Sequence, residues 1–378
     1  MKIIPREKSA KNENGKMDAV LMYAVFGLLV FGLIMIASAG VGYARTRFGD
    51  EYYFFKRQLL FGILPGLLIL TIIKNIDYRI WKKFSFIAFV VSIIALILVF
   101  VPGFGTKIYG ANRWLQLGPL SFQPAEMLKI SLILYLAAWL ESRREKITDF
   151  YEGLMPFVMI VALVSFLLIK QPDIGTLGVT ILIAMSIFFV SGAKISHMFA
   201  MGVAGFLALL ALIKFESYRM DRLLVFLHPE LDPRGIGYQI NQALLAIGSG
   251  GIFGVGLGHS LQKFNYLPEP VGDSIFAIIG EELGFFGEFV LIMLFVVFFL
   301  RGLRIAKNAP DMFGKLVATG IVSWITFQAF INISAISGLI PLTGIPLPFI
   351  SYGGTSIIFL LTSVGILLNI SKQTNLNS

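Results

Sequence analysis

The chain has 378 residues, of which 57% are hydrophobic and only 14% charged, and its mean hydropathy is +0.82. Soluble domains average about 45–50% apolar and about 25% charged residues, so this composition excludes a soluble enzyme, a nucleic-acid module and a disordered tail. The absence of cysteine excludes disulfides, thiolate metal sites and a cysteine nucleophile. The net charge of +9 comes from basic residues in loops between apolar runs, so it indicates membrane topology rather than nucleic-acid binding.

Runs of about 20 apolar residues predict helices that cross a bilayer. They predict an all-α, polytopic integral membrane protein with about ten transmembrane helices. The fourth and fifth runs are short for a full crossing, which leaves tilt or partial re-entry open for both. The first run is not followed by a small-residue cleavage site, so we expect it to remain on the protein. In chain order the runs are Ala19–Ala39, Phe54–Ile73, Phe84–Val101, Glu126–Leu140, Leu154–Ile169, Ile174–Val190, Ile195–Ile213, Ser274–Leu300, Met312–Ile336 and Ser351–Ile370.

The distribution of Lys and Arg between the runs favours an orientation with both termini in the cytoplasm, because most basic residues then lie inside. We therefore expect a cytoplasmic arm at 1–18, one membrane domain at 19–371 and a cytoplasmic tail at 372–378. A large extracytoplasmic loop, 214–273, separates the seventh and eighth helices. Its apolar stretch Tyr238–Ile247 predicts a short amphipathic or re-entrant helix. The sequence contains no evident internal repeat and no second soluble domain.

Ionisable residues inside membrane spans cost about 2.5–3.5 kcal/mol each on insertion scales, so each is a functional candidate. Glu126 and Lys129 lie three residues apart on one helical face and can pair. Such a pair either ties the fourth helix into the bundle or belongs to a functional cavity. Glu281 and Glu282 lie about two turns into the eighth helix, where adjacent side chains point about 100° apart. At most one of them can face the same cavity as Asp273, and a buried contact that fixes helix packing is the favoured interpretation.

Asp273 lies at the predicted outer N-terminus of the eighth helix. An Asp there either caps the helix or accepts a proton from a substrate hydroxyl at the membrane surface. Ser351 follows three prolines, which predicts an irregular, outer-facing segment before the tenth helix. Irregular backbone at membrane depth is tolerated only where it is buried in protein or lines a cavity. Cations predicted on the same side would bind phosphate or pyrophosphate, or contact lipid head groups, and they are Arg113, Arg219, Arg222 and Lys263.

Three common kinds of site are excluded by the motifs. The chain contains no GxxxxGK[ST] sequence, which excludes a Walker-type nucleotide site. The glycine cluster Gly248–Gly258 lacks GxGxxG and follows no soluble strand, which excludes a dinucleotide fold. The histidines His197, His228 and His259 are far apart and lack the HExxH spacing of a zinc site.

Several stretches resemble the SEDS family of bacterial cell-wall polymerases, the group that contains FtsW, RodA and SpoVE. They run from the third helix to the tenth, nearly the whole chain. The segments VPGFGTKIYGANRW and RFGDEYYFFKRQL look more like the division-type FtsW branch than the elongation-type RodA branch. The matching stretches are GANRWLQLGPLSFQPAEMLK (Gly110–Lys129), KQPDIGTLG (Lys170–Gly178), YRMDRLLVFLHPELDPRGIGYQINQALLAIGSGGIFGVGLG (Tyr218–Gly258), YLPEPVGDSIFAIIGEELGFFG (Tyr266–Gly287) and GLIPLTGIPLPFISYGGTS (Gly338–Ser356).

This resemblance implies a peptidoglycan glycosyltransferase of the bacterial cytoplasmic membrane. It would polymerise lipid II, the undecaprenyl-pyrophosphate disaccharide-peptide, into β-1,4 glycan strands at the outer membrane face. Family members have ten membrane helices and work with a cognate class B penicillin-binding transpeptidase, so divisome or elongasome proteins are expected partners. The family's essential acidic residue corresponds to Asp273, its buried pair to Glu126 and Lys129, and its QPD aspartate to Asp173. Many relatives have His-Thr before the essential Asp, whereas this chain has Val271-Gly272, so no role is carried over there.

The resulting hypothesis makes Asp273 the catalytic base, with a divalent cation (Mg²⁺ or Mn²⁺) as a candidate cofactor. A lipid II flippase is the main alternative, because buried charges also mark transport pathways. A flippase would gather its polar groups at the midplane and show repeats, whereas these candidates gather at the outer surface. A non-catalytic scaffold for a transpeptidase is a third possibility, and the residues leave division, elongation and sporulation roles open. The expected substrate and cavity residues are Arg113, Glu126, Lys129, Asp173, Arg219, Arg222, Gln239, Lys263, Glu281 and Ser351.

Overall fold

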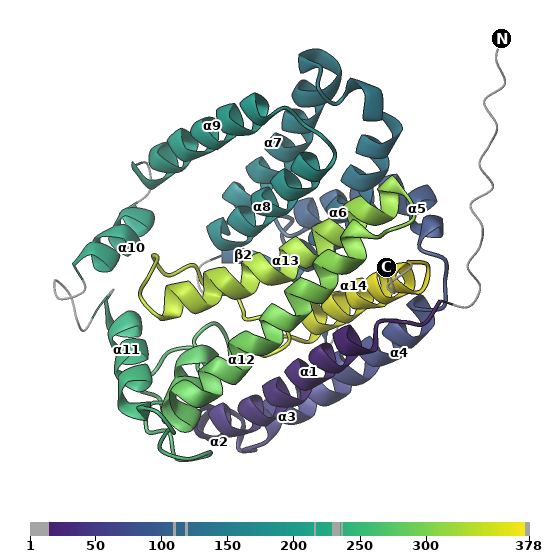
Figure 1. Ribbon diagram of the computed structural model, residues 1–378. Helices are drawn as coiled ribbons and strands as arrows, with labels where there is room; N and C mark the ends of the chain where they lie inside the picture. Colours follow the sequence, from purple (N-terminus) through teal and green to yellow (C-terminus); the bar gives the residue numbers. More distant parts are fainter. Residues whose placement is uncertain are drawn as a thin grey trace, which may run out of the picture.

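The computed structural model describes residues 15–108, 111–117, 120–214, 217–228, 235 and 237–374 (Figure 1). Each of the ten predicted apolar runs coincides with a helical segment. The long helices are α1 (Ala19–Ala39), α4 (Leu64–Ile73), α5 (Arg79–Leu98), α6 (Pro124–Ser142), α7 (Met155–Lys170), α8 (Ile174–Val190), α9 (Ile195–Lys214), α12 (Ile275–Lys307), α13 (Met312–Ile336) and α14 (Gly354–Lys372). A π-helical turn at Leu59–Ile63 joins α3 (Tyr53–Gln58) to α4, and another at Phe150–Leu154 precedes α7.

Length and composition identify the fold as that of a multi-pass membrane protein. Within the described residues, eight helical segments are long and apolar enough to cross a membrane, and α8 is a shorter apolar helix. The helix α6 is also 19 residues long, but it carries the charged residues Glu126, Lys129 and Glu141. The predicted all-α class is therefore confirmed.

The helix α13 forms the centre of the bundle and packs against α6, α8, α12 and α14. Figure 1 shows α12, α13 and α14 running side by side, with α1 and α4 along the same flank. A Cβ atom at Gly320 would come within 2.7 Å of Ile133 and 2.8 Å of Ile187. Glycine at this position therefore lets α6 and α8 pack closely on α13, as small residues do between membrane helices. By contrast, none of the 20 residues of α9 is buried.

A small antiparallel sheet connects α5 to α6, and the sequence did not predict it. Its strands are β1 (Gly105–Ile108), β2 (Ala111–Leu117) and β3 (Leu120–Phe122), in the order β1-β2-β3. Short strands in a connection carry no long apolar run, so a search for membrane spans misses them. The sheet places Arg113, on β2, near the start of α8, where its Nε donates to Gln171 O at 3.2 Å.

The segment between α9 and α12 contains two helices, α10 (Ser217–Leu227) and α11 (Tyr238–Gly250). The predicted helix at Tyr238–Ile247 is confirmed as α11. Glycine-rich turns then return the chain to α12, which is interrupted at Gly284 with φ 64° and ψ −167°. A Cβ atom at Gly284 would lie 2.4 Å from Gly254 N, so only glycine allows this close approach of two backbones. The interruption fixes α11 against the N-terminal part of α12.

The connection between α13 and α14, residues 338–353, is irregular, and we call it the 338–353 loop. The sequence predicted a broken segment here, and α14 indeed begins only at Gly354. Two further helices lie in connections: α2 (Val41–Phe48), which follows α1 directly, and a short 3-10 helix at Arg144–Lys146 between α6 and α7.

Candidate active site

A cavity of about 900 Å³ lies among β2, the start of α8, the end of α9, α10, α11, the segment before α12 and the 338–353 loop. Its walls combine charged groups with apolar side chains. Sequence-predicted site residues that line it come from five different elements and are Arg113, Arg222, Gln239, Asp273 and Ser351.

The carboxylate of Asp273 is not the cap of α12. The N-cap position is Ser274, and it makes no side-chain capping hydrogen bond. Gln239 Nε2 lies 3.0 Å from Ser274 Oγ and 3.4 Å from Asp273 Oδ1. The capping alternative is therefore wrong, and the carboxylate faces the cavity instead.

Two effects raise the pKa of Asp273 to about 6. The first is desolvation in the cavity wall, and the second is the negative charge of Glu269, which lines the same cavity. Arg222 and Gln239 act in the opposite direction because they favour the ionised form. The group is thus ionised at neutral pH and is a stronger base than an ordinary carboxylate, which suits general base catalysis.

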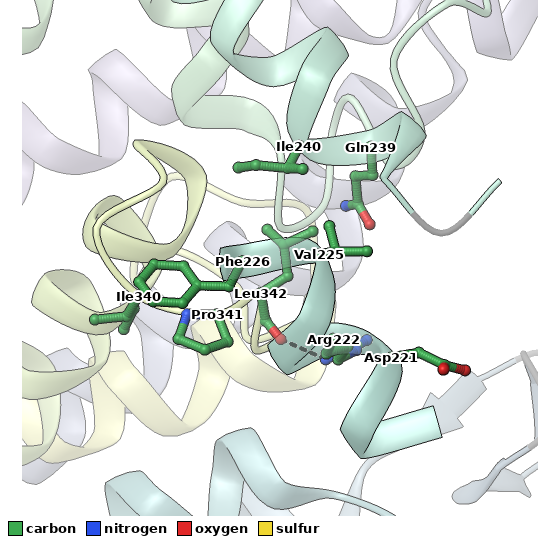
Figure 2. Close-up of a pocket in the computed structure, with 9 residues that line it drawn as sticks. All are labelled: Asp221, Arg222, Val225, Phe226, Gln239, Ile240, Ile340, Pro341 and Leu342. Atoms are coloured by element: carbon green, nitrogen blue, oxygen red, sulfur yellow. Dashed lines mark hydrogen bonds between the residues drawn. The ribbon is translucent and has the colours of Figure 1, made fainter. Parts of the chain in front are cut away.

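Arg222 reaches the cavity from α10 and is anchored to the 338–353 loop. Its Nη1 donates to Leu342 O at 2.7 Å, as the dashed line in Figure 2 shows. A smaller cavity of about 150 Å³ lies beside the first, between α10, α11 and this loop (Figure 2). Arg222 and Gln239 line both cavities, so they form part of the wall between them.

The main chain at Asp273 is fixed by side chains from α13 and the 338–353 loop. Asn332 Nδ2, on α13, donates to Asp273 O and to Ile345 O, each at 2.8 Å. Ser351 Oγ donates to Gly272 O at 2.7 Å and accepts from Leu347 N at 2.8 Å. Ser351 therefore lines the cavity and also joins the 338–353 loop to the segment that precedes α12.

Glu126 and Lys129 form the pair that their spacing predicted, with 2.8 Å between Nζ and Oε1 and only 2% exposure of each side chain. Lys129 Nζ also donates to Gln328 Oε1 at 2.8 Å, and Gln328 Nε2 donates to Pro346 O at 2.9 Å. On the other side, Ser356 Oγ donates to Glu126 Oε2 at 3.1 Å. Pro346 and Ser356 line the cavity. The pair thus stands behind the cavity wall and supports it, rather than facing the interior.

Asp173 likewise lies behind the residues that line the cavity and contacts them. Its carboxylate caps α8 by accepting from Thr176 N at 3.2 Å. Its other oxygen lies 4.0 Å from Arg113 Nε. Asp173 therefore holds the start of α8 and helps to orient Arg113, which itself reaches the cavity.

Lys263 and Glu281 are expected cavity residues that lie elsewhere, which corrects the prediction. Lys263 Nζ donates to Glu282 Oε1 at 2.8 Å and to Ser38 Oγ at 3.3 Å, and the residue is only 1% exposed. Glu281 accepts from Leu261 N at 2.9 Å and from the hydroxyl of Ser260. The physical reason is that the turn after α11 folds back onto α12 and buries these charges as partners. The favoured packing interpretation of the two glutamates agrees with these contacts.

The side chain of Arg219 lies outside the described residues. Three residues that the sequence analysis did not assign also belong to the site region: Glu269 in the cavity, and Gln328 and Asn332 behind it. The two amides stand in the predicted span Met312–Ile336, where polar groups in an apolar run are a usable signal. In the part of the chain that the structure describes, no group of three or more His, Cys, Asp or Glu residues is placed to hold a metal.

The comparisons with known proteins agree with this architecture. The family model described as "Cell cycle protein", for FtsW, RodA and SpoVE, matches residues 19–376. The chain belongs to this family. It is 43% identical over 357 residues to stage V sporulation protein E of Bacillus subtilis (strain 168), covering 94% of this chain and 97% of that protein. It is 40% identical over 354 residues to the probable peptidoglycan glycosyltransferase FtsW of Geobacter sp. (strain M18), covering 94% and 96%.

Solved structures show the same fold. A chain from "Structural coordination of polymerization and crosslinking by a peptidoglycan synthase complex" matches with a TM-score of 0.76 and 27% identity, covering 94% of this chain and 97% of that one. The Rod shape determining protein RodA of Thermus thermophilus matches with a TM-score of 0.70 and 27% identity, covering 95% and 98%. Both matches span almost the full length of this chain and of the matched chain.

Removing one member of the Glu126–Lys129 pair should destabilise the protein strongly. An uncompensated buried charge costs about 3–5 kcal/mol, whereas removal of both partners is milder. We expect Glu126→Ala and Lys129→Ala each to lower the thermal unfolding midpoint in detergent more than the double variant does. Single variants as stable as the unmodified protein would contradict a structural role for the pair.

Asn332→Leu should destabilise the protein because it leaves two carbonyls, Asp273 O and Ile345 O, without their donor. An unsatisfied buried polar group costs about 1–3 kcal/mol. The matched control is Asn75→Leu, at an exposed amide that donates to Thr71 O and accepts from Lys372 Nζ, with an expected effect within about 0.5 kcal/mol. Thermal unfolding of both variants measures the difference, and equal midpoints would show that the Asn332 bridge is dispensable.

Proposed function

We propose that this chain is a peptidoglycan glycosyltransferase that polymerises lipid II into β-1,4-linked glycan strands at the outer face of the cytoplasmic membrane. One observation carries the proposal. The carboxylate of Asp273 does not cap α12, and it lines a large cavity together with Arg113 and Arg222. The glycosyltransferase names of the FtsW relatives support the same activity.

The reaction requires a base and a set of cations. The 4-hydroxyl of one sugar attacks C1 of another sugar, which carries an α-linked pyrophosphate. The new O4–C1 bond forms as the bond from C1 to the pyrophosphate oxygen breaks, which inverts C1 and gives a β-1,4 link. Asp273 accepts the proton of the hydroxyl. Arg113 and Arg222 stabilise the negative charge that develops on the departing pyrophosphate.

The lining of the cavity fits an amphipathic substrate. Its polar groups gather around Asp273, whereas Leu209, Leu212 and Ile213 contribute an apolar wall from the end of α9. Because α9 has no buried residue, this wall adjoins the lipid phase. A polyprenyl chain would follow the apolar wall while the pyrophosphate and sugars lie at the polar end.

A divalent cation fits the carboxylates of the cavity. Mg²⁺ in proteins usually takes one or two carboxylates and completes its shell with substrate phosphates and water. Glu269, which lines the cavity together with Asp273, would hold such an ion with the pyrophosphate and leave Asp273 to accept the proton. When bound, the ion supplies positive charge to the leaving group.

The proposed topology has both termini in the cytoplasm, with an N-terminal arm at 1–18, a single membrane domain at 19–371 and a tail at 372–378. This orientation puts the cavity at the outer face, where the 214–273 segment contributes to its wall. A class B penicillin-binding transpeptidase is the proposed partner, since the matching solved structure concerns coordinated polymerization and crosslinking. The FtsW names favour a role in cell division, within a divisome.

Transport of lipid II is the competing function, and the buried charges argue against it. Glu126 pairs with Lys129, and Glu282 pairs with Lys263, all within the protein interior. Charges fixed in this way serve packing rather than a moving ion. The charged groups that face an open space lie instead at the cavity, around Asp273.

Asp273→Asn should abolish polymerisation without harming the fold. Asparagine keeps the size of the side chain but cannot act as a base, and positioned base catalysis contributes about 10²–10⁴-fold. We expect at least a hundredfold loss of glycan synthesis from purified lipid II, measured as a ladder of products on a gel. The control is Asp50→Asn, an exposed aspartate that pairs with Lys56 at 2.8 Å. A full ladder from a folded Asp273→Asn protein would refute the assignment.

The rate should fall as the pH drops through about 6. The base must be ionised, and the pKa of Asp273 is raised to about 6, so the active fraction is lost below this pH. Glu269→Gln removes a negative charge that raises this pKa, so its rate profile should move to lower pH. Initial rates between pH 5 and 8 measure both profiles. A profile that stays flat to pH 5 would contradict a base with this pKa.

A further inference from the structure

Gly344 occupies a special position in the 338–353 loop. It lines the cavity, and its φ of +70° lies in the region that favours glycine. A Cβ atom built on it would lie 3.7 Å from Asp273 Oδ2 and 3.9 Å from Arg222 Nη2. These are ordinary contact distances, so a methyl group would fit sterically. It would, however, fill the space that the carboxylate and the guanidinium both face.

The backbone on either side of Gly344 is tied to these same two groups. Leu342 O accepts from Arg222 Nη1 at 2.7 Å. Ile345 O accepts from Asn332 Nδ2 at 2.8 Å, and the same amide nitrogen holds Asp273 O at 2.8 Å. The separation between the carboxylate, the guanidinium and the floor of the space is therefore set by direct hydrogen bonds.

The loop also packs closely on the start of α8, whose Gly175 lines the cavity as well. A Cβ atom at Gly175 would lie 2.8 Å from Thr343 O and 2.5 Å from the Ile345 side chain, so the loop has no room to shift toward α8. A side chain at Gly344 would thus stay in the space above it rather than push the loop back. The geometry is that of a preorganised gap with a backbone floor.

We infer that this gap above Gly344 binds the attacking sugar hydroxyl of the acceptor, and that Gly344 determines whether the hydroxyl can enter. The inference rests on the proposed function. A base must lie about 2.6–3.2 Å from the oxygen whose proton it removes. An oxygen about 1 Å closer to Asp273 Oδ2 than the built Cβ position meets this requirement. The Cβ atom of any other residue would lie only about 1 Å from this oxygen position, so the two could not be present together.

In this gap the attacking hydroxyl and the departing pyrophosphate have different partners. The hydroxyl oxygen forms its bond to C1 of the donor while its proton passes to Asp273 Oδ2. The bond between C1 and the pyrophosphate oxygen breaks, and its electron pair leaves with the pyrophosphate toward Arg222. Gly344 takes no part in the chemistry, since it provides the space in which the oxygen lies.

The test compares Gly344→Ala with a matched substitution, Gly338→Ala. Gly338 lies in the same loop at a φ of +73°, so both variants carry the strain of an L residue at positive φ. A Cβ atom at Gly338 would meet only Leu244 and Ile240 side chains, at 3.5–4.0 Å, and Gly338 lies outside the residues that line the cavity. The pair of variants therefore separates backbone strain from loss of the gap.

Initial rates are measured with the full-length purified protein across a range of lipid II concentrations, together with the thermal midpoint of each variant. We expect Gly344→Ala to lower kcat at least tenfold with KM within threefold, because contacts to the lipid and pyrophosphate remain. Gly338→Ala should keep kcat within threefold of the unmodified protein, with a similar midpoint. Equal rates for the two variants would overturn the inference and leave the proposed function standing.

Two further outcomes are also decisive. If Gly344→Ala does not fold, Gly344→Asn replaces it, since asparagine adopts positive φ more readily and its larger side chain fills the gap as well. A folded Gly344→Asn protein with the rate of the unmodified protein would overturn the inference. If the unmodified protein makes no glycan from lipid II at all, the proposed function fails, and this result differs from any result of the glycine comparison.

Discussion

A single buried amide, Asn332 on α13, joins the two irregular segments that form the polar end of the cavity. Its Nδ2 donates to Asp273 O and Ile345 O, each at 2.8 Å. Irregular backbone among membrane helices must have its polar groups satisfied by protein or by the cavity that it lines. Side chains such as Asn332, Gln328 and Ser351 meet this requirement at the 338–353 loop. The same bonds that make the loop tolerable in a membrane also hold Asp273 in position.

The ionisable residues of the protein meet the cost of burial in two different ways. Glu126 with Lys129 and Glu282 with Lys263 form close pairs that are almost fully buried. These pairs hold helices and turns together and face no cavity. Asp273, in contrast, lies in the cavity wall, where desolvation and Glu269 raise its pKa to about 6. A buried charge next to an opposite charge therefore forms a structural ion pair. A buried carboxylate that lines a cavity, such as Asp273, instead becomes a stronger base.

The cavity combines these polar groups with an apolar wall, and this combination follows from how loosely α9 packs. The helix has no buried residue, yet its last turns supply Leu209, Leu212 and Ile213 to the cavity. One side of the cavity is thus continuous with the lipid-facing surface, and the other ends at Asp273 and the arginines. An amphipathic substrate that is anchored in the membrane and reacts at its polar end matches this arrangement.

The sequence by itself determined the features that depend on local patterns. Apolar runs located the helices, the spacing of three located the Glu126–Lys129 pair, and the prolines indicated the break before α14. Asp273 was also identified from the sequence, although only the structure showed that Ser274 takes the N-cap position. Tertiary structure alone decided that Lys263 turns inward to Glu282 while Arg222 reaches Leu342, 120 residues away in the chain. It alone decided the β1-β2-β3 sheet and the Asn332 bridge, because contacts between distant segments leave no periodic signal in the residues that make them.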